Sequence, residues 1–293
     1  MTRSGFVALA GRPNVGKSTL VNAIVGRKVA IVSDRPQTTR RAIRGVATTD
    51  TWQMVLVDLP GVQRPRDALT ARMQRRVERE LADCDVALVV VDGAAGIGPG
   101  DRFIARLLSP SPVPVVIAVN KLDRLDRPRT VLALQAAAEM EAGEEVFPVS
   151  ARTGSGVQAL VADLAGRLPP GPFLFSPDQA SDLPRDRLLA ELVREQVLSR
   201  TFQEVPHAVE VVVEDVEAPR PGVTVVRAVV WVETESQRGI LVGAGGAMVK
   251  AIGAAARPEL ERELGTRVHL ELSVRVRRRW RADEALLDRL GID

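Results

Sequence analysis

The segment GRPNVGKS at residues 11–18 constrains the fold of this chain more than any other feature. It matches the pattern G-x-x-x-x-G-K-[ST] at every fixed position, follows a strand-like run and opens a helix-like one. In that context, backbone N–H groups around residues 14–17 enclose phosphate groups, Lys17 neutralises the outer phosphate oxygens and Ser18 binds Mg²⁺. We therefore expect an α/β nucleotide-binding domain at the start of the chain.

Strand-like and helix-like segments alternate over the first 167 residues, as such a domain requires. The strand-like runs are rich in valine and isoleucine, which is typical of strands buried on both faces of a mostly parallel sheet. The run 44–61 has Thr49-Asp50 at its centre and predicts a hairpin, so one edge of a mixed six-stranded sheet is expected to be antiparallel. The strand-like runs are 5–11, 44–61, 86–93, 114–121 and 144–150, and the helix-like segments are 17–25, 69–82, 101–108, 128–141 and 156–168.

The composition changes after the last of these segments. Residues 168–184, LPPGPFLFSPDQASDLP, have four prolines among their first ten residues, which disfavours both helix and sheet. We interpret 169–184 as a linker between a domain at 1–168 and a second one at 185–293. The second pattern predicts a small α+β domain with helix 185–200, strands 208–216 and 223–234, a helical pair, strand 266–277 and helix 283–290.

Composition and charge narrow the class of protein. Hydrophobic residues make up 45% and charged residues 26% of the chain, and no run of about 18 apolar residues predicts a membrane span. The only cysteine, Cys84, excludes an internal disulfide framework and fits a reducing cytosol. The pI of 9.6 suggests an anionic partner. However, 185–293 carries 17 lysines and arginines against 18 acidic residues, so only a local arginine cluster at 275–281 supports nucleic-acid binding there.

The sequence NKLD at residues 120–123 predicts the base of the nucleotide. The Asp123 carboxylate can accept hydrogen bonds from guanine N1–H and the 2-amino group, and adenine offers no matching donors. Asn120 can bond guanine N7 and brace the phosphate loop, while the stem of Lys121 can lie over the base. SAR at 150–152 follows the next strand and would bring the Ala151 N–H close to guanine O6. In this order after a phosphate loop, the motifs predict GTP.

Two further segments predict groups that sense the γ-phosphate. In DLPG, Asp58 would hold Mg²⁺ through water, and the Gly61 N–H would contact the γ-phosphate. The segment SDRPQTTRR contains two adjacent threonines. Thr39 is the first choice for a contact to Mg²⁺ and Thr38 the second; a plain loop that leads into a strand is the alternative.

Hydrolysis is expected to be slow. Val62 follows Gly61, where many Ras-like GTPases have a glutamine that orients the attacking water. Valine cannot do this, so we expect hydrolysis to depend on backbone groups and on a monovalent cation beside Asn14, with Lys17, Thr39 and Gly61 as the catalytic set. The residues expected to contact GTP are Gly11, Arg12, Pro13, Asn14, Val15, Gly16, Lys17, Ser18, Thr19, Asp58, Leu59, Pro60, Gly61, Val62, Asn120, Lys121, Asp123, Ser150 and Ala151.

These motifs resemble those of the Era family of bacterial GTPases over essentially the whole chain. The resemblance extends beyond the linker to REQVLSRTFQEVPHAVEV (194–211), ILVGAGGAMVKAIG (240–253) and VRVRRRWRADEALLDRLG (274–291). It implies a Ras-like GTPase domain followed by a type II KH domain, which binds the single-stranded 3′ end of small-subunit (16S) ribosomal RNA and acts in assembly of the 30S subunit. It also implies a GTP/GDP cycle with Mg²⁺, K⁺ stimulation through Asn14, a monomer, and a cytoplasmic location with some contact at the cell membrane.

The second glycine-rich loop, Gly243-Ala244-Gly245-Gly246, fits the G-x-x-G loop with which KH domains clamp about four single-stranded nucleotides. Relatives usually carry a basic residue in place of Ala244, and its loss removes one phosphate contact. Leu59 replaces a usual threonine, with little expected consequence. Lys250 and four alternating arginines, which would share one face of an extended strand, are expected to compensate. The expected RNA-binding residues are Gly243, Ala244, Gly245, Gly246, Lys250, Arg275, Arg277, Arg279 and Arg281.

Two other classes of function stay open at this point. One is a signalling GTPase at the membrane periphery whose C-terminal domain binds lipid or protein. The arginine cluster fits it, but the sequence has no amphipathic basic helix with bulky aromatics. The other is a metabolic GTPase with a structural second domain. RNA binding that depends on Gly243 and Gly246 separates the first interpretation from both.

Overall fold

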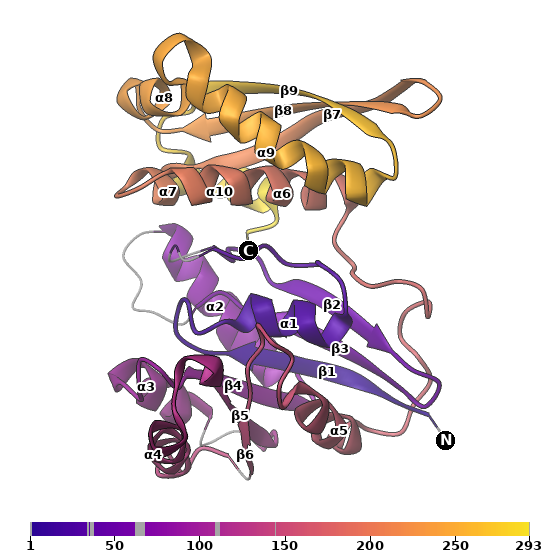
Figure 1. The fold of residues 1–293 in the computed structure, drawn as a ribbon, viewed down its shortest axis with the longest axis vertical. Helices are drawn as coiled ribbons and strands as arrows, with labels where there is room; N and C mark the ends of the chain where they lie inside the picture. The colour runs from indigo at the N-terminus through magenta and orange to yellow at the C-terminus, as the bar shows by residue number, and fades with distance from the viewer. Residues whose placement is uncertain are drawn as a thin grey trace. The chain divides into compact units, whose positions relative to one another are not determined.

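The computed structural model describes residues 2–33, 35, 38–61, 68–108, 112–143 and 145–292. The chain divides into two compact units, and each is described by itself (Figure 1). The first unit comprises residues 1–32, 39–182 and 291–293, and the second comprises 33–38 and 183–290.

The first unit is built on the predicted mixed six-stranded sheet, in the order β2-β3-β1-β4-β5-β6. Strands β1 and β3 to β6 are parallel, and β2 pairs with β3 antiparallel as the predicted hairpin. Strands β4 and β5 are almost fully buried because helices cover both faces, which explains their near-continuous valine runs. The strands are β1 Arg3–Ala10, β2 Ile43–Thr48, β3 Trp52–Asp58, β4 Val86–Asp92, β5 Val115–Asn120 and β6 Glu145–Pro148.

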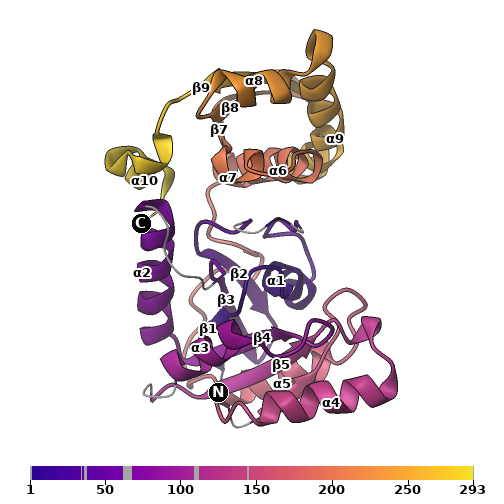
Figure 2. The same cartoon turned by 90° about the vertical axis from the view of Figure 1, so that its left-hand side faces the viewer.

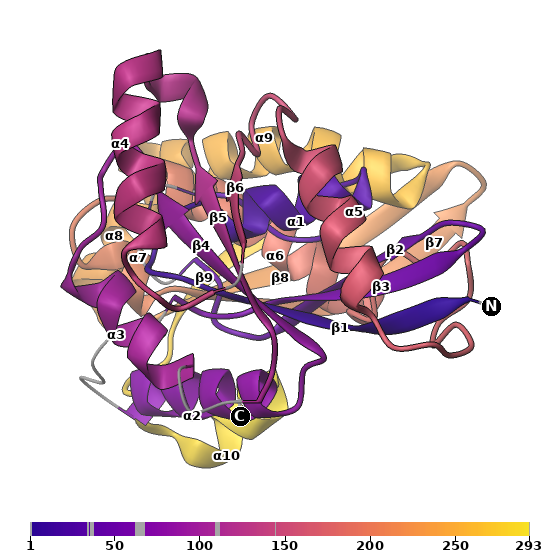
Figure 3. The same ribbon diagram turned by 90° about the horizontal axis from the view of Figure 1, so that it is seen from below.

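Helices pack on both faces of this sheet (Figure 3). On one face, α1 and α5 bury Leu20 and Leu160 against the strands. On the other, α2, α3 and α4 contribute residues such as Leu81 and Ile104. The helices are α1 Lys17–Val25, α2 Ala68–Ala82, α3 Pro99–Leu108, the short η1 Leu122–Arg124, α4 Arg127–Ala138 and α5 Val157–Arg167.

The proline-rich segment interpreted as a linker packs with the first unit up to Asp182. Isolated bridges join Pro170 to Arg3 and Ser181 to Gly45, and the buried Gln53 side chain binds the backbone of residues 174 and 175. Proline prevents this segment from forming a regular strand, but its remaining backbone groups find partners along the sheet.

The second unit is an α+β domain with a three-stranded sheet, in the order β7-β8-β9 (Figure 2). Strand β7 is antiparallel to β8, and β9 is parallel to β8. Leu189, Ile252 and Leu260 belong to one core with the inner residues of β8. The elements are α6 Arg185–Arg200, α7 Val205–Ala208, β7 Glu210–Arg220, β8 Val223–Val232, α8 Glu235–Val242, η2 Ala244–Gly246, α9 Ala247–Leu264, β9 Arg267–Val276, η3 Trp280–Ala282 and α10 Glu284–Leu290.

Within the described ranges, no single helix is long and apolar enough to cross a membrane. Helix α8 and residues 244–264 meet that test of length and composition only when they are taken together, with a bend of 43° between them.

Candidate functional site

The predicted nucleotide-binding residues gather at the carboxyl edge of the first sheet, where α/β proteins bind ligands. The phosphate loop follows β1 and leads into α1, whose N-cap Gly16 has φ 99°. A Cβ at Gly16 would lie 2.4 Å from the Asn120 amide nitrogen, so the loop needs glycine both for its left-handed backbone and for this close approach. Gly61 lies against Pro13 of the same loop, which brings the DLPG segment beside the phosphate loop.

Lys17 is buried inside the phosphate loop. Its ammonium donates to the carbonyl oxygens of Gly11 and Arg12, both at 3.1 Å. Burial lowers the pKa of Lys17 to about 8, and the opposite charge of Asp58 limits the shift. A buried lysine in a glycine-rich loop that leads into a helix is well suited to bind phosphate oxygens.

Three oxygen-bearing side chains meet beside this lysine. The Ser18 hydroxyl donates to Asp58 Oδ2 at 2.6 Å, the Thr39 hydroxyl donates to the same oxygen at 3.2 Å, and the two hydroxyls lie 3.2 Å apart. Burial raises the pKa of Asp58, while Lys17 and the two hydroxyls oppose the rise. The other carboxylate oxygen, Asp58 Oδ1, is buried and has no hydrogen-bond partner among the described residues.

Geometry distinguishes the two adjacent threonines. The Thr38 hydroxyl donates to the carbonyl of Arg35 at 2.6 Å, whereas the Thr39 hydroxyl lies beside Ser18 and Asp58. Thr39, the first choice from the sequence, is therefore the threonine whose side chain belongs to this oxygen cluster.

The NKLD residues connect the base-binding region to the phosphate loop. Asn120 donates through its side-chain amide to the carbonyl of Val15 at 2.9 Å and so braces the loop as expected. Lys121 adopts a left-handed backbone, with φ 65°, and its ammonium binds the carbonyl of Asn14 and the carboxylate of Asp92.

Asp123 is held by residues that follow β6. The Ser150 hydroxyl donates to Asp123 Oδ1 at 2.6 Å, and Arg152 forms an ion pair with Oδ2. The Ser150 hydrogen bond is the main cause that keeps the pKa of Asp123 below its ordinary value, and Arg152 adds to it. The Ala151 N–H, expected near the base, donates to Asn120 Oδ1 at 2.9 Å because that amide lies between the two loops.

Several residues of this region were not identified from the sequence. Asp92 ends β4 and binds Lys121, and its position at the carboxyl end of a buried strand is a signal that could have revealed it. Arg12, by contrast, was predicted to contact GTP; in the structure it forms an ion pair with the fully buried Asp101 at 2.8 Å and donates to the carbonyl of Gly96. Arg152 is exposed and gave no such signal.

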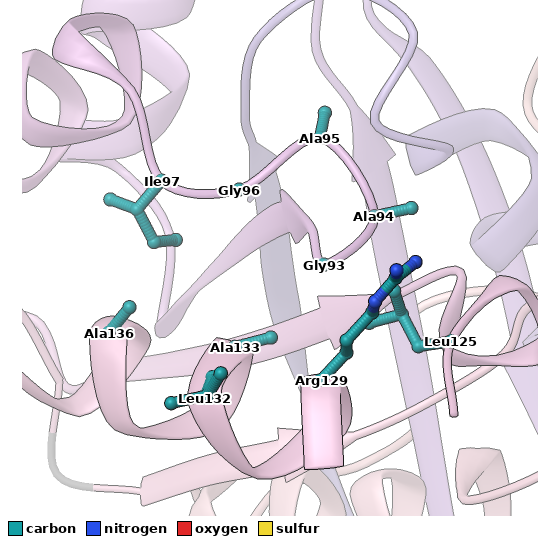
Figure 4. A pocket seen from close by; sticks show the side chains of 10 residues that line it. All are labelled: Gly93, Ala94, Ala95, Gly96, Ile97, Leu125, Arg129, Leu132, Ala133 and Ala136. Atoms are coloured by element: carbon teal, nitrogen blue, oxygen red, sulfur yellow. The ribbon is translucent and has the colours of Figure 1, made fainter. Parts of the chain in front are cut away.

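A cavity of about 440 Å³ lies beside these residues (Figure 4). The backbone of residues 93–97 forms one wall, and Leu125, Arg129 and Leu132 line another. Because Arg12 holds the Gly96 carbonyl and Asp92 accepts the N–H groups of Ala94 and Ala95, this wall is fastened to the nucleotide-binding loops.

Leu59 and Val62 are two positions where the sequence departs from related GTPases. Leu59 is fully buried and belongs to the core on one face of the sheet, so a leucine there packs well in place of a polar residue. Val62, the residue where a water-orienting glutamine was sought, lies outside the described residues.

In the second unit, the G-x-x-G loop connects α8 to α9. Helix α8 begins with a capping box formed by Thr234 and Gln237. Gly243 and Gly246 have φ of 71° and 81°, and a Cβ at Gly243 would lie 2.9 Å from the Met248 nitrogen. The loop therefore needs glycine, and its exposed backbone leads directly into the first turn of α9, which carries the exposed Lys250.

The arginines after this loop do not form the strand face expected from their alternation. Strand β9 ends at Val276, and the chain then turns because Trp280 is completely buried and donates to the Ala208 carbonyl. Arg279 has φ 55°, and Arg281 lies in η3. The prediction of a shared strand face is thus wrong for Arg279 and Arg281.

The arginines of this group are also engaged with neighbours. Arg275 forms an ion pair with Glu214 at 2.6 Å, and Arg281 forms one with Glu233 at 2.6 Å. The Arg277 guanidinium stacks 4.6 Å from the centre of the Trp231 ring. Their positive charge is therefore partly compensated within the second unit.

Comparison with known proteins identifies both domains. A family model described as a 50S ribosome-binding GTPase matches residues 6–121, and a KH domain model matches residues 204–281. The GTPase Era of Lactobacillus helveticus is 43% identical over 99% of this chain and 96% of its own length. This chain belongs to the Era family of GTPases. The GTPase Era of Mycobacterium tuberculosis is 44% identical over 98% of both chains.

Solved structures of Era have the same fold over their whole length. One, of Era in complex with MgGDPNP and nucleotides 1506–1542 of 16S ribosomal RNA, has a TM-score of 0.95 and 34% sequence identity, and covers 100% of this chain and 99% of that one. Another, of a variant of Aquifex aeolicus Era bound to GDP.AlF4⁻, has a TM-score of 0.94 and 33% identity, and covers 99% of each chain. The predicted order of a P-loop GTPase domain and a KH domain is confirmed.

Proposed function

We propose that this protein is a GTP-hydrolysing switch of the cytoplasm that binds the 3′ region of 16S ribosomal RNA as a monomer and acts in assembly of the 30S subunit. The observation that carries the proposal is the presence, in one chain, of a guanine-nucleotide site and a KH loop, with two different sets of neighbours. Asp58 and Asn120 bind residues of the first loop, whereas the second lies between two helices and has an exposed backbone.

The chain's own groups account for nucleotide binding. Lys17 and the backbone of the phosphate loop would hold the phosphates, and the Gly61 N–H would contact the γ-phosphate. Asp123 would accept both guanine donors once its carboxylate is turned from Ser150 and Arg152 toward the base. Because no polar side chain is assigned to the attacking water, turnover is expected to be slow.

The residues around Asp58 fit a magnesium ion. The donors are two hydroxyls and a carboxylate, which are hard oxygen ligands, and Asp58 Oδ1 is a buried oxygen in need of a partner. Ser18 and Thr39 would hold Mg²⁺ directly and Asp58 would hold it through water. When bound, the ion neutralises charge that develops on the phosphate oxygens.

Asn14 is the proposed K⁺ residue. It lies in the phosphate loop and has a left-handed backbone, with φ 65°. A cation there would supply positive charge in place of the missing glutamine. Hydrolysis is expected to be several-fold faster in KCl than in NaCl, and equal rates in the two salts would remove K⁺ from the proposal.

RNA binding is assigned to the loop 243–246 and to Lys250. The glycines allow the loop to lie against a sugar-phosphate backbone, and Lys250 supplies a charge to phosphate. The Era structure that contains nucleotides 1506–1542 of 16S ribosomal RNA supports the choice of RNA for this chain.

The proposal is tested with a labelled RNA that copies the 3′ region of 16S ribosomal RNA and with a scrambled RNA of the same composition. The full chain, loaded with Mg²⁺ and a non-hydrolysable GTP analogue, is titrated against each RNA by fluorescence anisotropy. We expect at least about tenfold tighter binding to the native sequence, and equal binding to the two RNAs would reject the assignment of the 3′ region.

A further inference from the structure

Part of the segment that precedes Thr39 belongs to the second unit. Residues 33–38 group with 183–290, whereas Thr39 groups with the first unit. The division between the units therefore falls at the peptide bond between Thr38 and Thr39. Of the six residues before this bond, the structure describes Ser33, Arg35 and Thr38.

Arg194 of α6 holds the end of this segment. Its side chain is 1% exposed and donates to both carboxylate oxygens of Glu191, at 3.1 and 2.5 Å, and to the carbonyl oxygen of Thr38. Replacement of a buried ion pair by apolar residues is often neutral or favourable, so stability alone does not require this pair. Its additional contact is a backbone oxygen of the segment that leads to the magnesium-site threonine.

A second contact, with Phe202, holds Arg35 of the same segment. The Arg35 guanidinium stacks 4.5 Å from the centre of the Phe202 ring, and Phe202 is 63% exposed. The Thr38 hydroxyl donates to the Arg35 carbonyl at 2.6 Å, which joins these two residues. Arg35 and Thr38 are thus each held by a residue that precedes β7.

We infer that Arg194 and Phe202 are positioning residues that transmit the nucleotide state of the first unit to the RNA affinity of the second through Arg35, Thr38 and Thr39, an inference that rests on the proposed function. The γ-phosphate acts on Thr39, whose hydroxyl lies 3.2 Å from Ser18 and Asp58. Movement of Thr39 shifts the adjacent Thr38 carbonyl, and Arg194 then loses the acceptor. Because such coupling is reciprocal, RNA must change nucleotide affinity by the same factor.

The test compares the full chain with two double variants. Glu191→Met/Arg194→Met removes both members of the ion pair at once, so neither charge is left without the other, and we expect the fold to be retained. The matched control is Glu259→Met/Arg262→Met, which removes a less buried pair of the same residue types and the same i,i+3 spacing on α9, at 2.7 Å. Phe202→Leu is a third variant that removes only the stacking partner of Arg35.

The quantity measured is the ratio of the RNA Kd with GDP to the RNA Kd with a non-hydrolysable GTP analogue. In the wild type and the control we expect this ratio to differ from one by about fivefold or more, a typical size for allosteric coupling. In Glu191→Met/Arg194→Met it should lie within about twofold of one, with the RNA itself still bound, and Phe202→Leu should lie between the two.

The failures of the two proposals can be told apart. An unchanged ratio in Glu191→Met/Arg194→Met, or a wild-type ratio of one with RNA still bound, overturns this inference and leaves the proposed function in place. Loss of coupling in the control as well overturns the special role of Arg194. Absence of RNA binding by the wild type rejects the proposed function itself.

Discussion

Ser18 and Asp58 lie 40 residues apart in the chain, yet the Ser18 hydroxyl donates to Asp58 Oδ2 at 2.6 Å. The parallel pairing of β1 with β3 produces this contact, because it brings the ends of both strands to one edge of the sheet. The same register places the phosphate loop beside the DLPG segment. The geometry of the proposed magnesium site is therefore a consequence of the strand order.

Asp58→Asn should weaken the apparent affinity for Mg²⁺, measured from the Mg²⁺ dependence of GTP hydrolysis, by about 10- to 100-fold. The amide keeps the shape but loses the charge that holds the metal-bound water. Since burial already raises the pKa of Asp58, the thermal unfolding temperature should not fall. Asp85→Asn is the control. The Asp85 carboxylate, directly before β4, accepts the Phe6 N–H, and this variant should keep the wild-type Mg²⁺ dependence. A wild-type Mg²⁺ dependence in Asp58→Asn contradicts the assignment.

Thr39→Ala should lower the rate of GTP hydrolysis by at least about tenfold, because it removes a hydroxyl that lies beside Ser18 and Asp58. Thr38→Ala is the matched control, since its hydroxyl binds the Arg35 carbonyl and its own carbonyl is unchanged. Single-turnover hydrolysis measures both variants. A larger loss of hydrolysis in Thr38→Ala than in Thr39→Ala would assign the metal contact to Thr38.

Asp123→Asn should lower the affinity for GTP by about 100-fold, because the new amide donors face the N1–H and 2-amino donors of guanine. Xanthosine triphosphate, which has a carbonyl at position 2, should bind the variant better than it binds the wild type. Asp126→Asn changes a neighbouring carboxylate that caps α4 and should bind GTP normally. Competition against a fluorescent nucleotide measures all three proteins, and an unaltered preference for GTP in Asp123→Asn would exclude this carboxylate as the guanine reader.

Nucleotide affinity should fall as the pH rises above about 8. In the free protein Lys17 loses its proton near that pH, whereas bound phosphate favours the charged lysine. The protonated fraction falls about tenfold between pH 7 and pH 9, so the affinity should fall by a similar factor. The Lys17→Met variant should bind the nucleotide weakly and with an affinity that does not change with pH. The same variant controls for ionisation of guanine, because any pH dependence that it keeps comes from the nucleotide.

The same shift has a defined effect on stability. Lys17 has a pKa of about 8 in the folded protein against 10.5 for the ordinary side chain, so the unfolded chain binds more protons between these values. The free energy of unfolding contributed by Lys17 should therefore rise with pH from about 8 to 10.5. Urea titrations of the nucleotide-free protein at pH 7.5 and 9.5, compared with Lys17→Met, measure this sign. A wild-type curve that follows the variant over this range would contradict the lowered pKa.

Local sequence patterns were sufficient to predict most of the helices and strands. Helix α1 and helix α6 begin and end at the residues that periodicity predicts, and the hairpin at Thr49-Asp50 forms as expected. These features depend on neighbours a few residues apart along the chain. The phosphate loop and NKLD belong to the same class, since each motif carries its own backbone geometry.

Features that depend on distant residues could not be predicted in this way. Alternation suggested that Arg279 and Arg281 share a strand face with Arg275, but the chain turns after Val276 because Trp280 is buried. Prolines suggested a linker, and nothing in the sequence indicated that the Gln53 side chain binds its backbone. The choice between Thr38 and Thr39 needed the position of Asp58, and the contact of Arg194 with Thr38 joins residues 156 positions apart.

The central claim is that the two glycine-rich loops bind different ligands, GTP at Gly16 and RNA at Gly246. The most direct measurement titrates Gly16→Val and Gly246→Asp with a fluorescent GTP analogue and with the 16S 3′-region RNA. We predict that Gly16→Val loses the nucleotide but binds RNA like the nucleotide-free wild type, and that Gly246→Asp loses RNA but keeps the nucleotide. RNA binding that survives Gly246→Asp, or a nucleotide site that fails with it, would contradict the account.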